Sequence, residues 1–157
     1  MPRIQNSIII CKDPQTVFDI TNDIERWPIL FNEYHGAKIL NRESEGRYTR
    51  LSFQLTNAEG NTWRSQRLLD HQQMVATAER EEPLYPFAYM HLKWTCEAAP
   101  EGTKMTWTQD FELDPKYPDP LPVVLDRMNA HTVENQQNIK EKIESGQAEK
   151  LTAEAMR

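Results

Sequence analysis

The stretch DPLPVVLDRMNAHTVENQQNIKEKIESG, residues 119–146, decides the fold of this chain. Its apolar side chains recur at spacings of three and four, which is the period of an amphipathic helix. We expect Asp119 to cap this helix, Pro120 to occupy its first position and Gly146 to end it. A helix of about 25 residues is roughly 40 Å long. The predicted buried stripe is Leu121, Leu125, Met128, Thr132, Val133, Gln136, Ile139 and Ile143.

The middle of this helix is polar, whereas its two ends are apolar. Asn129, Thr132 and Gln136 lie in that middle part. One interpretation is a loosely patterned stripe whose polar groups are satisfied by hydrogen bonds. The other is that the helix covers an interior that is partly hollow and wet. The helix pattern alone leaves both interpretations open.

Segments with strand-like alternation fill most of the chain before the helix. Arg3–Cys11 is predicted to be the first strand, followed by short helices at Pro14–Thr21 and around Ile24–Leu30. Short turns separate the later strands, which favours an antiparallel meander. These strands are predicted at His35–Asn41, Arg47–Leu55, Asn61–Leu69, Met74–Glu81, Ala88–Cys96 and Thr103–Leu113.

This order of elements predicts an α+β domain over residues 1–146. A curved antiparallel seven-stranded sheet would wrap around the long C-terminal helix, with the two short helices at one end and an internal cavity between the layers. Residues 147–157 are polar and are expected to form a frayed tail.

Composition excludes several classes of function. The net charge is −6 and no cluster of Lys and Arg stands out, which argues against nucleic acid binding. The sequence shows neither a signal peptide nor an apolar run that could cross a bilayer, so a cytoplasmic protein without membrane contact is expected. Cys11 and Cys96 are predicted to be reduced and buried. The four histidines lack metal-ligand spacing, so no metal site is expected.

The faces of the predicted strands carry the strongest functional signal. Trp63, Ser65 and Arg67 share one face of their strand, because alternate side chains point the same way. An arginine on a core face is costly unless it is paired or hydrated. One interpretation therefore places Trp63 outside and Leu68 inside. The inward sets on the last two strands are Ala88, Met90, Leu92, Trp94 and Cys96, and Met105, Trp107, Gln109 and Phe111.

The alternative interpretation is a polar cavity. Ser65, Arg67 and Gln109 from the sheet would then meet the polar residues of the long helix between aromatic walls. Aromatic walls with a few placed polar groups are typical of a small-molecule site. None of the inward strand positions is Asp or Glu, which argues against a hydrolase driven by carboxylates.

Several sequence blocks carry a specific family resemblance. The most specific are TNDIERWP at residues 21–28 and PFAYM at residues 86–90. With them, the chain resembles the single-domain aromatase/cyclases of bacterial type II aromatic polyketide synthases, which have the Bet v 1/START-like helix-grip fold of the SRPBCC superfamily. The likeness runs from Asn6 to Glu144 through Asn6–Ile9, Val17–Pro28, Leu30–Tyr34, Trp63–Arg67, Pro86–Thr95, Met105–Phe111 and Asn138–Glu144.

This resemblance implies an enzyme that folds a linear poly-β-ketone held on an acyl carrier protein, closes the first ring by an aldol reaction and dehydrates it. No cofactor is implied, and the ketosynthase/chain length factor is a further possible partner. By motif, Arg67, Tyr34, Ser65 and Gln109 would be catalytic. The expected substrate-binding residues are Trp27, Phe31, Trp63, Arg80, Met90, Trp94, Trp107, Asn129, Thr132 and Gln136.

The expected chemistry follows from these residue types. Arg67 would hold an enolate oxygen through fixed hydrogen bonds. Tyr34 beside this cation is expected to have a lowered pKa and to relay protons. Arg42, Arg47 and Arg50 are a candidate basic patch for the carrier protein.

The sequence leaves two other functions open. One is a non-catalytic carrier of a hydrophobic small molecule that uses the same fold, because fold alone does not settle function. The other is a regulatory ligand-sensing domain, which the lack of a second domain disfavours.

Overall fold

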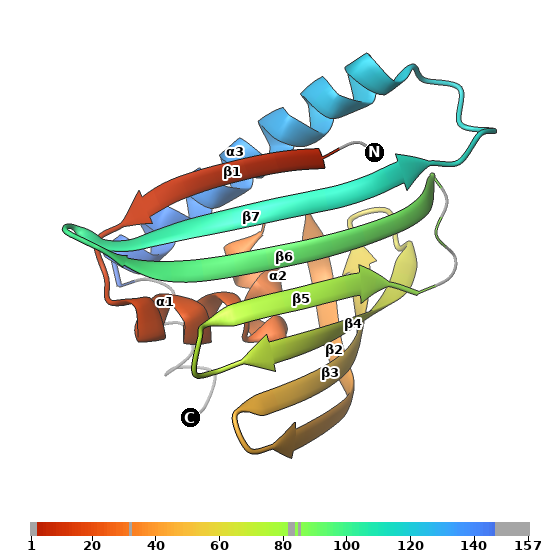
Figure 1. Ribbon diagram of the computed structural model, residues 1–157. Coiled ribbons are helices and arrows are strands. Elements are labelled where there is room, and N and C mark those ends of the chain that lie inside the picture. The colour runs from red at the N-terminus through yellow and green to blue at the C-terminus, as the bar shows by residue number, and fades with distance from the viewer. Residues whose placement is uncertain (1–2, 32, 82–83, 85, 147–157) are drawn as a thin grey trace.

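The computed structural model describes residues 3–31, 33–81, 84 and 86–146. In these ranges one antiparallel sheet, with strand order β1-β7-β6-β5-β4-β3-β2, curves around a long C-terminal helix (Figure 1). The predicted fold is confirmed, while the predicted tail at 147–157 lies outside the described residues. The elements are β1 (Arg3–Ile10), α1 (Pro14–Thr21), η1 (Ile24–Arg26), α2 (Trp27–Leu30), β2 (Tyr34–Glu45), β3 (Tyr48–Asn57), β4 (Thr62–Asp70), β5 (Val75–Arg80), β6 (Phe87–Ala99), β7 (Gly102–Leu113) and α3 (Leu121–Glu144).

Helix α3 ends as predicted but begins differently. Gly146 follows it with a φ of 77°, a left-handed conformation that glycine adopts without strain. Pro120, rather than Asp119, is the N-cap residue, and no side chain caps the helix there. The Asp119 carboxylate instead accepts a hydrogen bond of 2.9 Å from Arg127 Nη2, about two turns into the helix. The predicted cap is wrong because this arginine takes the carboxylate.

The buried face of α3 is rotated slightly from the predicted stripe. Two residues of that stripe, Leu121 and Val133, are 38% and 49% exposed. Thr132 and Val133 are consecutive and point about 100° apart, so only one of them faces the sheet. The buried residues of the helix are Val124, Thr132, Asn135, Gln136, Ile139 and Ile143.

Apolar side chains from the end of β1, from β7 and from the last turns of α3 pack together in the interior. Ile10, Ile139, Ile143 and Met105 are fully buried in one apolar cluster there. Cys96 belongs to the same cluster, as predicted, and burial raises the pKa of its thiol to about 12. The predicted burial of Cys11 is wrong, because the chain has left β1 there and the residue is exposed.

The inward faces of β6 and β7 agree with the predicted alternation except at Ala88. A β-bulge shifts the register between Phe87 and Tyr89, so that Ala88 is exposed. Phe87 takes its place on the inner side and packs edge-on against Phe111, with ring centroids 5.6 Å apart. Strict alternation from Met90 backwards could not anticipate the extra residue.

The predicted helix around Ile24–Leu30 is split into η1 and α2, with Pro28 in the first turn of α2. This pair brings Trp27 and Phe31 against the inner face of the sheet, where both are buried. Trp27 is fixed by a hydrogen bond of 3.0 Å from its Nε1 to the carbonyl oxygen of Thr21. None of the helices in the described ranges is long and apolar enough to cross a membrane.

Candidate functional site

A cavity of about 280 Å³ lies between the inner face of the sheet, the short helices and α3. This volume is near the lower end of the range for small-molecule sites, about 300–1,000 Å³. Its aromatic walls are Trp27, Phe31, Tyr34, Phe53, Trp63, Phe87, Trp94 and Trp107. Its polar lining is Glu33, Ser65, Arg67, Glu79, Arg80, Gln109, His131, Thr132 and Asn135.

Strand β4 presents Arg67 to this cavity. Trp63, Ser65 and Arg67 share the inner face, and Arg67 is only 2% exposed. The interpretation that places Trp63 outside is therefore wrong. The guanidinium carbon lies 4.2 Å from the ring centroid of Trp94 and 5.4 Å from that of Trp27. These two rings stabilise a buried cation without neutralising it.

The hydrogen bonding of Arg67 is incomplete. Its Nε donates to the side-chain oxygen of Asn22 at 2.9 Å. Its Nη2 is buried and has no hydrogen-bond partner among the described residues. Burial lowers the pKa of Arg67 to about 9, so the group is still protonated at neutral pH. A buried donor without an acceptor costs free energy, which a ligand oxygen would recover.

Two more buried donors at the cavity have no partner in the described part of the chain. They are Trp107 Nε1 and Arg80 Nε. Trp107 is held by stacking on Trp94, with ring centroids 4.1 Å apart and planes 8° from parallel. Arg80 lies over the ring of Trp63 at 5.2 Å, and burial lowers its pKa. The cavity therefore offers hydrogen-bond donors in excess, which suits a ligand rich in carbonyl oxygens.

Tyr34 lines the cavity, but its predicted electrostatics are wrong. Burial raises the pKa of the Tyr34 phenol, and the nearby Glu33 carboxylate raises it further. The cations Arg67 and Arg80 act in the opposite direction without overcoming these effects. At neutral pH the phenol is therefore a proton donor and not a phenolate.

The predicted polar residues of the sheet and the helix meet in part. Gln109 on β7 accepts a hydrogen bond of 2.9 Å from the Thr132 hydroxyl on α3, which ties the two layers together at the cavity. Ser65, Met90, Trp107 and the other predicted catalytic and binding residues also line it, except for Asn129 and Gln136.

Asn129 and Gln136 do not line the cavity. The Gln136 side chain donates to the backbone carbonyl of Asn6 at 3.1 Å, and the Asn6 side chain donates to Asn129 at 2.9 Å. Both side chains therefore fasten α3 to strand β1. These two residues are polar because they bond to the edge strand of the sheet, and the prediction that they bind the substrate is wrong.

Sequence reasoning missed a polar cluster on the cavity wall. Glu33 accepts hydrogen bonds from Asn135 Nδ2 at 3.1 Å and pairs with His131 Nε2 at 2.7 Å. His131 and Asn135 are four residues apart, so they lie on one face of α3. Glu33 directly precedes Tyr34 in the block Leu30–Tyr34, which was the available signal.

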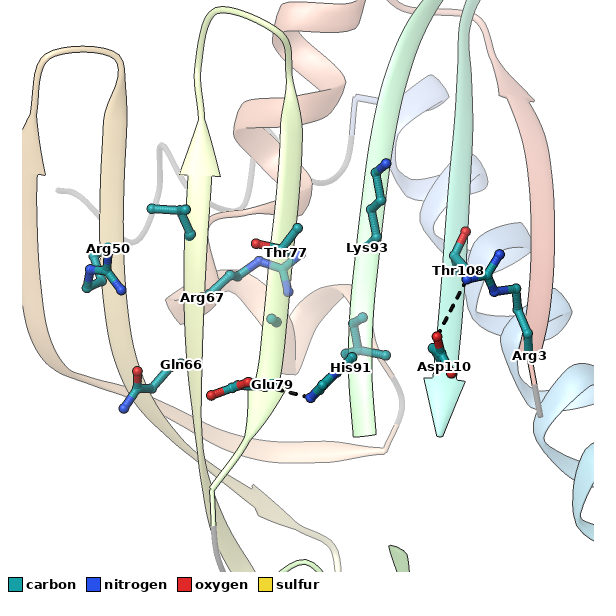
Figure 2. Close-up of a pocket in the computed structure, with 13 residues that line it drawn as sticks. Arg3, Arg50, Gln66, Arg67, Thr77, Glu79, His91, Lys93, Thr108 and Asp110 are labelled. Carbon is teal, nitrogen blue, oxygen red and sulfur yellow. Dashed lines mark ion pairs between the residues drawn. The ribbon is translucent and has the colours of Figure 1, made fainter. Parts of the chain in front are cut away.

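A second hollow, on the outer face of the sheet, is distinct from this cavity. Figure 2 shows it with Glu79 paired to His91 and Arg3 paired to Asp110, at 3.6 and 3.5 Å. These groups are mostly solvated and form shallow surface pairs. Arg67 lines both hollows because it belongs to β4, which lies between them. Its buried guanidinium contacts Trp27 and Trp94.

Of the three arginines predicted to form one basic patch, Arg47 and Arg50 border one surface hollow, whereas Arg42 borders a groove beside α1. Arg47 is engaged by Asp70 at 2.7 Å and Gln72 at 3.0 Å. Arg50 also borders the outer hollow of Figure 2, and a role of these arginines toward a carrier protein stays a prediction. Within the described ranges, no group of three His, Cys, Asp or Glu side chains is placed to hold a metal ion.

The fold and the enclosed cavity define a helix-grip protein of the Bet v 1/START-like class. A START superfamily protein from Mycobacterium smegmatis superposes with a TM-score of 0.67 at 19% identity, over 95% of this chain and 98% of that one. The ZhuI aromatase/cyclase from Streptomyces sp. R1128 superposes with a TM-score of 0.70 at 18% identity, over 94% and 93%. At these identities the likeness concerns the fold.

Sequence comparison identifies the family. The model of the family described as "Polyketide cyclase / dehydrase and lipid transport" matches residues 10–140. A protein from Streptomyces cyaneus that is named as a candidate polyketide cyclase is 40% identical over 119 residues, which are 73% of this chain and 75% of that protein. The chain belongs to the polyketide cyclase/dehydrase family.

Proposed function

We propose that this protein is a polyketide aromatase/cyclase. It takes a linear poly-β-ketone carried on an acyl carrier protein, folds it in the cavity and closes the first ring by an intramolecular aldol reaction. Loss of water then yields an aromatic ring. Membership of the cyclase family and a cavity rich in unpaired donors support this proposal.

The observation that carries the proposal is the state of Arg67. The guanidinium is 2% exposed, lies against two tryptophan faces and keeps Nη2 free of any partner among the described residues. A buried charge without a compensating partner costs folding free energy. Its presence therefore supports a functional role for Arg67. A poly-β-ketone supplies what is missing, because a carbonyl or enolate oxygen accepts hydrogen bonds from such a group.

Ring closure needs an enolate as the carbon nucleophile and a proton donor for the alkoxide that forms. The CH₂ between two carbonyl groups loses a proton to water or to a carboxylate such as Glu33, giving an enolate. Arg67 stabilises the enolate oxygen through charge-assisted hydrogen bonds. The enolate carbon attacks a ketone carbon further along the chain, so one C–C bond forms and the carbonyl oxygen becomes an alkoxide.

The protonated Tyr34 is the donor that completes the addition. Because burial raises the pKa of this phenol, it holds its proton until an alkoxide of higher basicity forms beside it. The new hydroxyl then leaves as water with loss of an adjacent C–H proton, and enolisation of the ring ketones gives the aromatic product. Ser65 and Gln109 hold further carbonyl groups, and the aromatic walls keep the chain folded.

The test is reconstitution with a minimal polyketide synthase. Without this protein, the chain cyclises spontaneously into a mixture of products. Adding the wild-type protein is expected to converge that mixture on one product with an aromatic first ring, identified by mass spectrometry and NMR. Arg67→Met is expected to reduce this product at least tenfold, because the cation that lies against Trp27 and Trp94 is gone.

Arg64→Met is the matched control. Arg64 lies on the same strand, is exposed and points to the opposite face, so its loss should leave the product distribution unchanged. Convergence by Arg67→Met at the wild-type yield would contradict the proposed role. If the wild-type protein leaves the mixture unchanged yet binds polyphenols tightly, it is a carrier, a function also named in the description of the family.

A further inference from the structure

The partner of Arg67 is a neutral amide where a carboxylate is usual. A buried arginine is normally paired with Asp or Glu. Here the Asn22 side-chain oxygen accepts from Arg67 Nε at 2.9 Å, and within the described part of the chain no carboxylate lies at ion-pair distance from the guanidinium. The positive charge is thus oriented without being compensated.

The local fold fixes the orientation of this amide. Asn22 is the C-cap residue of α1 and is 6% exposed. Its Nδ2 donates to the carbonyl oxygen of Phe18 at 2.9 Å, and its backbone N–H donates to the same oxygen at 3.1 Å. With the amide nitrogen engaged there, the amide oxygen is the atom that meets Arg67. The end of α1 therefore acts as a rigid holder for the guanidinium.

The other charged groups at the cavity do not compensate the positive charge of Arg67. Glu33 is held by His131 and Asn135, and Glu79 pairs with His91 on the outer face. Arg80 adds a second cation, and Tyr34 stays neutral because burial raises its pKa. The uncompensated charge therefore favours an anionic ligand oxygen placed directly against Arg67, whereas the phenol of Tyr34 lies near Glu33 and stays protonated.

We propose that Asn22 is a positioning residue that holds Arg67 through a neutral amide, so that the cavity selects ligands carrying an anionic oxygen, such as enolates of 1,3-diketones and phenolates. The inference rests on the proposed function for the place of the ligand in the cavity. A carboxylate at the same position would orient Arg67 equally well but would neutralise it. The neutrality of residue 22 is thus a functional requirement and not a packing requirement.

A direct probe is 1-phenyl-1,3-butanedione, whose enolate absorbs at longer wavelength than its neutral forms. Titration of the probe against pH, free and bound to the protein, measures how strongly the cavity prefers the enolate. The wild-type protein is expected to bind the enolate at least about tenfold more tightly than the neutral forms, since charge-assisted hydrogen bonds have about twice the strength of neutral ones. The apparent pKa of the bound probe then falls by about one unit or more.

Two variants separate charge from position. Asn22→Asp keeps an acceptor next to Arg67 but compensates its charge, and it is expected to abolish the enolate preference without lowering the melting temperature. Asn22→Ala keeps the charge but removes the acceptor, so the preference should persist while affinity falls severalfold. Asn41→Asp adds the same charge at an exposed position of β2 and should behave as wild type.

Retention of the full enolate preference by Asn22→Asp would overturn the proposal. If Asn22→Asp does not fold, Asn22→Ala still decides, because wild-type affinity in that variant would exclude a positioning role. The probe needs no carrier protein and undergoes no cyclisation. A wild-type protein that prefers the enolate but does not direct polyketide products would therefore contradict the cyclase proposal alone.

Discussion

The two halves of α3 cover two different interiors. Its C-terminal half places Ile139 and Ile143, both 0% exposed, in a buried apolar cluster with Ile10 and Met105. Its N-terminal half places Met128 and Thr132 over a cavity that holds a buried cation. One helix thus closes a conventional core at one end and a polar chamber at the other.

This difference teaches where stability and chemistry reside in the domain. Apolar burial at the packed end contributes stability that tolerates an uncompensated Arg67 at the hollow end. A helix that is long enough to span both regions links them mechanically. Substitutions at the two ends should therefore differ in the size and even in the sign of their effect on unfolding.

The largest effect is expected from Ile139→Ala at the packed end. Removal of a fully buried aliphatic side chain leaves a void and should cost about 2–5 kcal/mol of unfolding free energy. Met128→Ala on the same helix, over the cavity, should cost less than half as much because its surroundings are already partly empty. Urea denaturation measures both, and equal losses would contradict the division of α3 into two regions.

Arg67→Met should have the opposite sign. Burial lowers the pKa of Arg67 to about 9, which means that the charged form is destabilised in the folded protein relative to the unfolded chain below that pH. Replacing a buried charge by an apolar side chain of similar length removes this cost, so stability at pH 7 should rise by about 1 kcal/mol or stay unchanged. A loss of several kcal/mol on denaturation would show that Arg67 is a structural residue.

The smallest effect concerns the ionisation of Tyr34. Its raised pKa keeps the phenol protonated in the folded protein while the same phenol ionises near pH 10 in the unfolded chain. Its contribution to stability is therefore complete below about pH 10 and is lost as the pH rises further. At pH 10.5, native wild-type and Tyr34→Phe proteins should show equal phenolate absorbance. In urea the wild type should show the absorbance of about three-quarters of a phenolate more, because pH 10.5 is about half a unit above the unfolded pKa.

Alternation and helical period were sufficient to predict most of the fold. Period two placed Met90, Trp94 and Trp107 inside. The same rule put Trp63 and Arg67 on one face of their strand but left open whether that face points inward. The exception is Ala88, because a bulge inserts a residue without changing the composition of the strand. Asp119 is a further miss, since Arg127 competes for its carboxylate and no local rule weighs that competition.

The site was harder to predict than the fold for a physical reason. Neighbouring residues on α3 point in directions about 100° apart, so one can face the cavity and the next the edge of the sheet. Asn135 lines the cavity, whereas Gln136 bonds to the edge strand β1. The pKa of Tyr34 depends on the balance between burial and nearby cations, and burial wins only in the assembled structure. Glu33 matters because two side chains of α3 reach it from about 100 residues away in sequence.

The bonds from α3 to β1 have a consequence for the rest of the molecule. Strand β1 is an edge of the sheet, and an exposed edge is a template on which another chain can add a strand. Gln136 occupies the carbonyl of Asn6, and Lys140 occupies that of Ile9. Two of the carbonyl oxygens that an added strand would need are therefore already hydrogen-bonded. Lifting α3 from the sheet would break both hydrogen bonds and return these two carbonyl oxygens to an open edge.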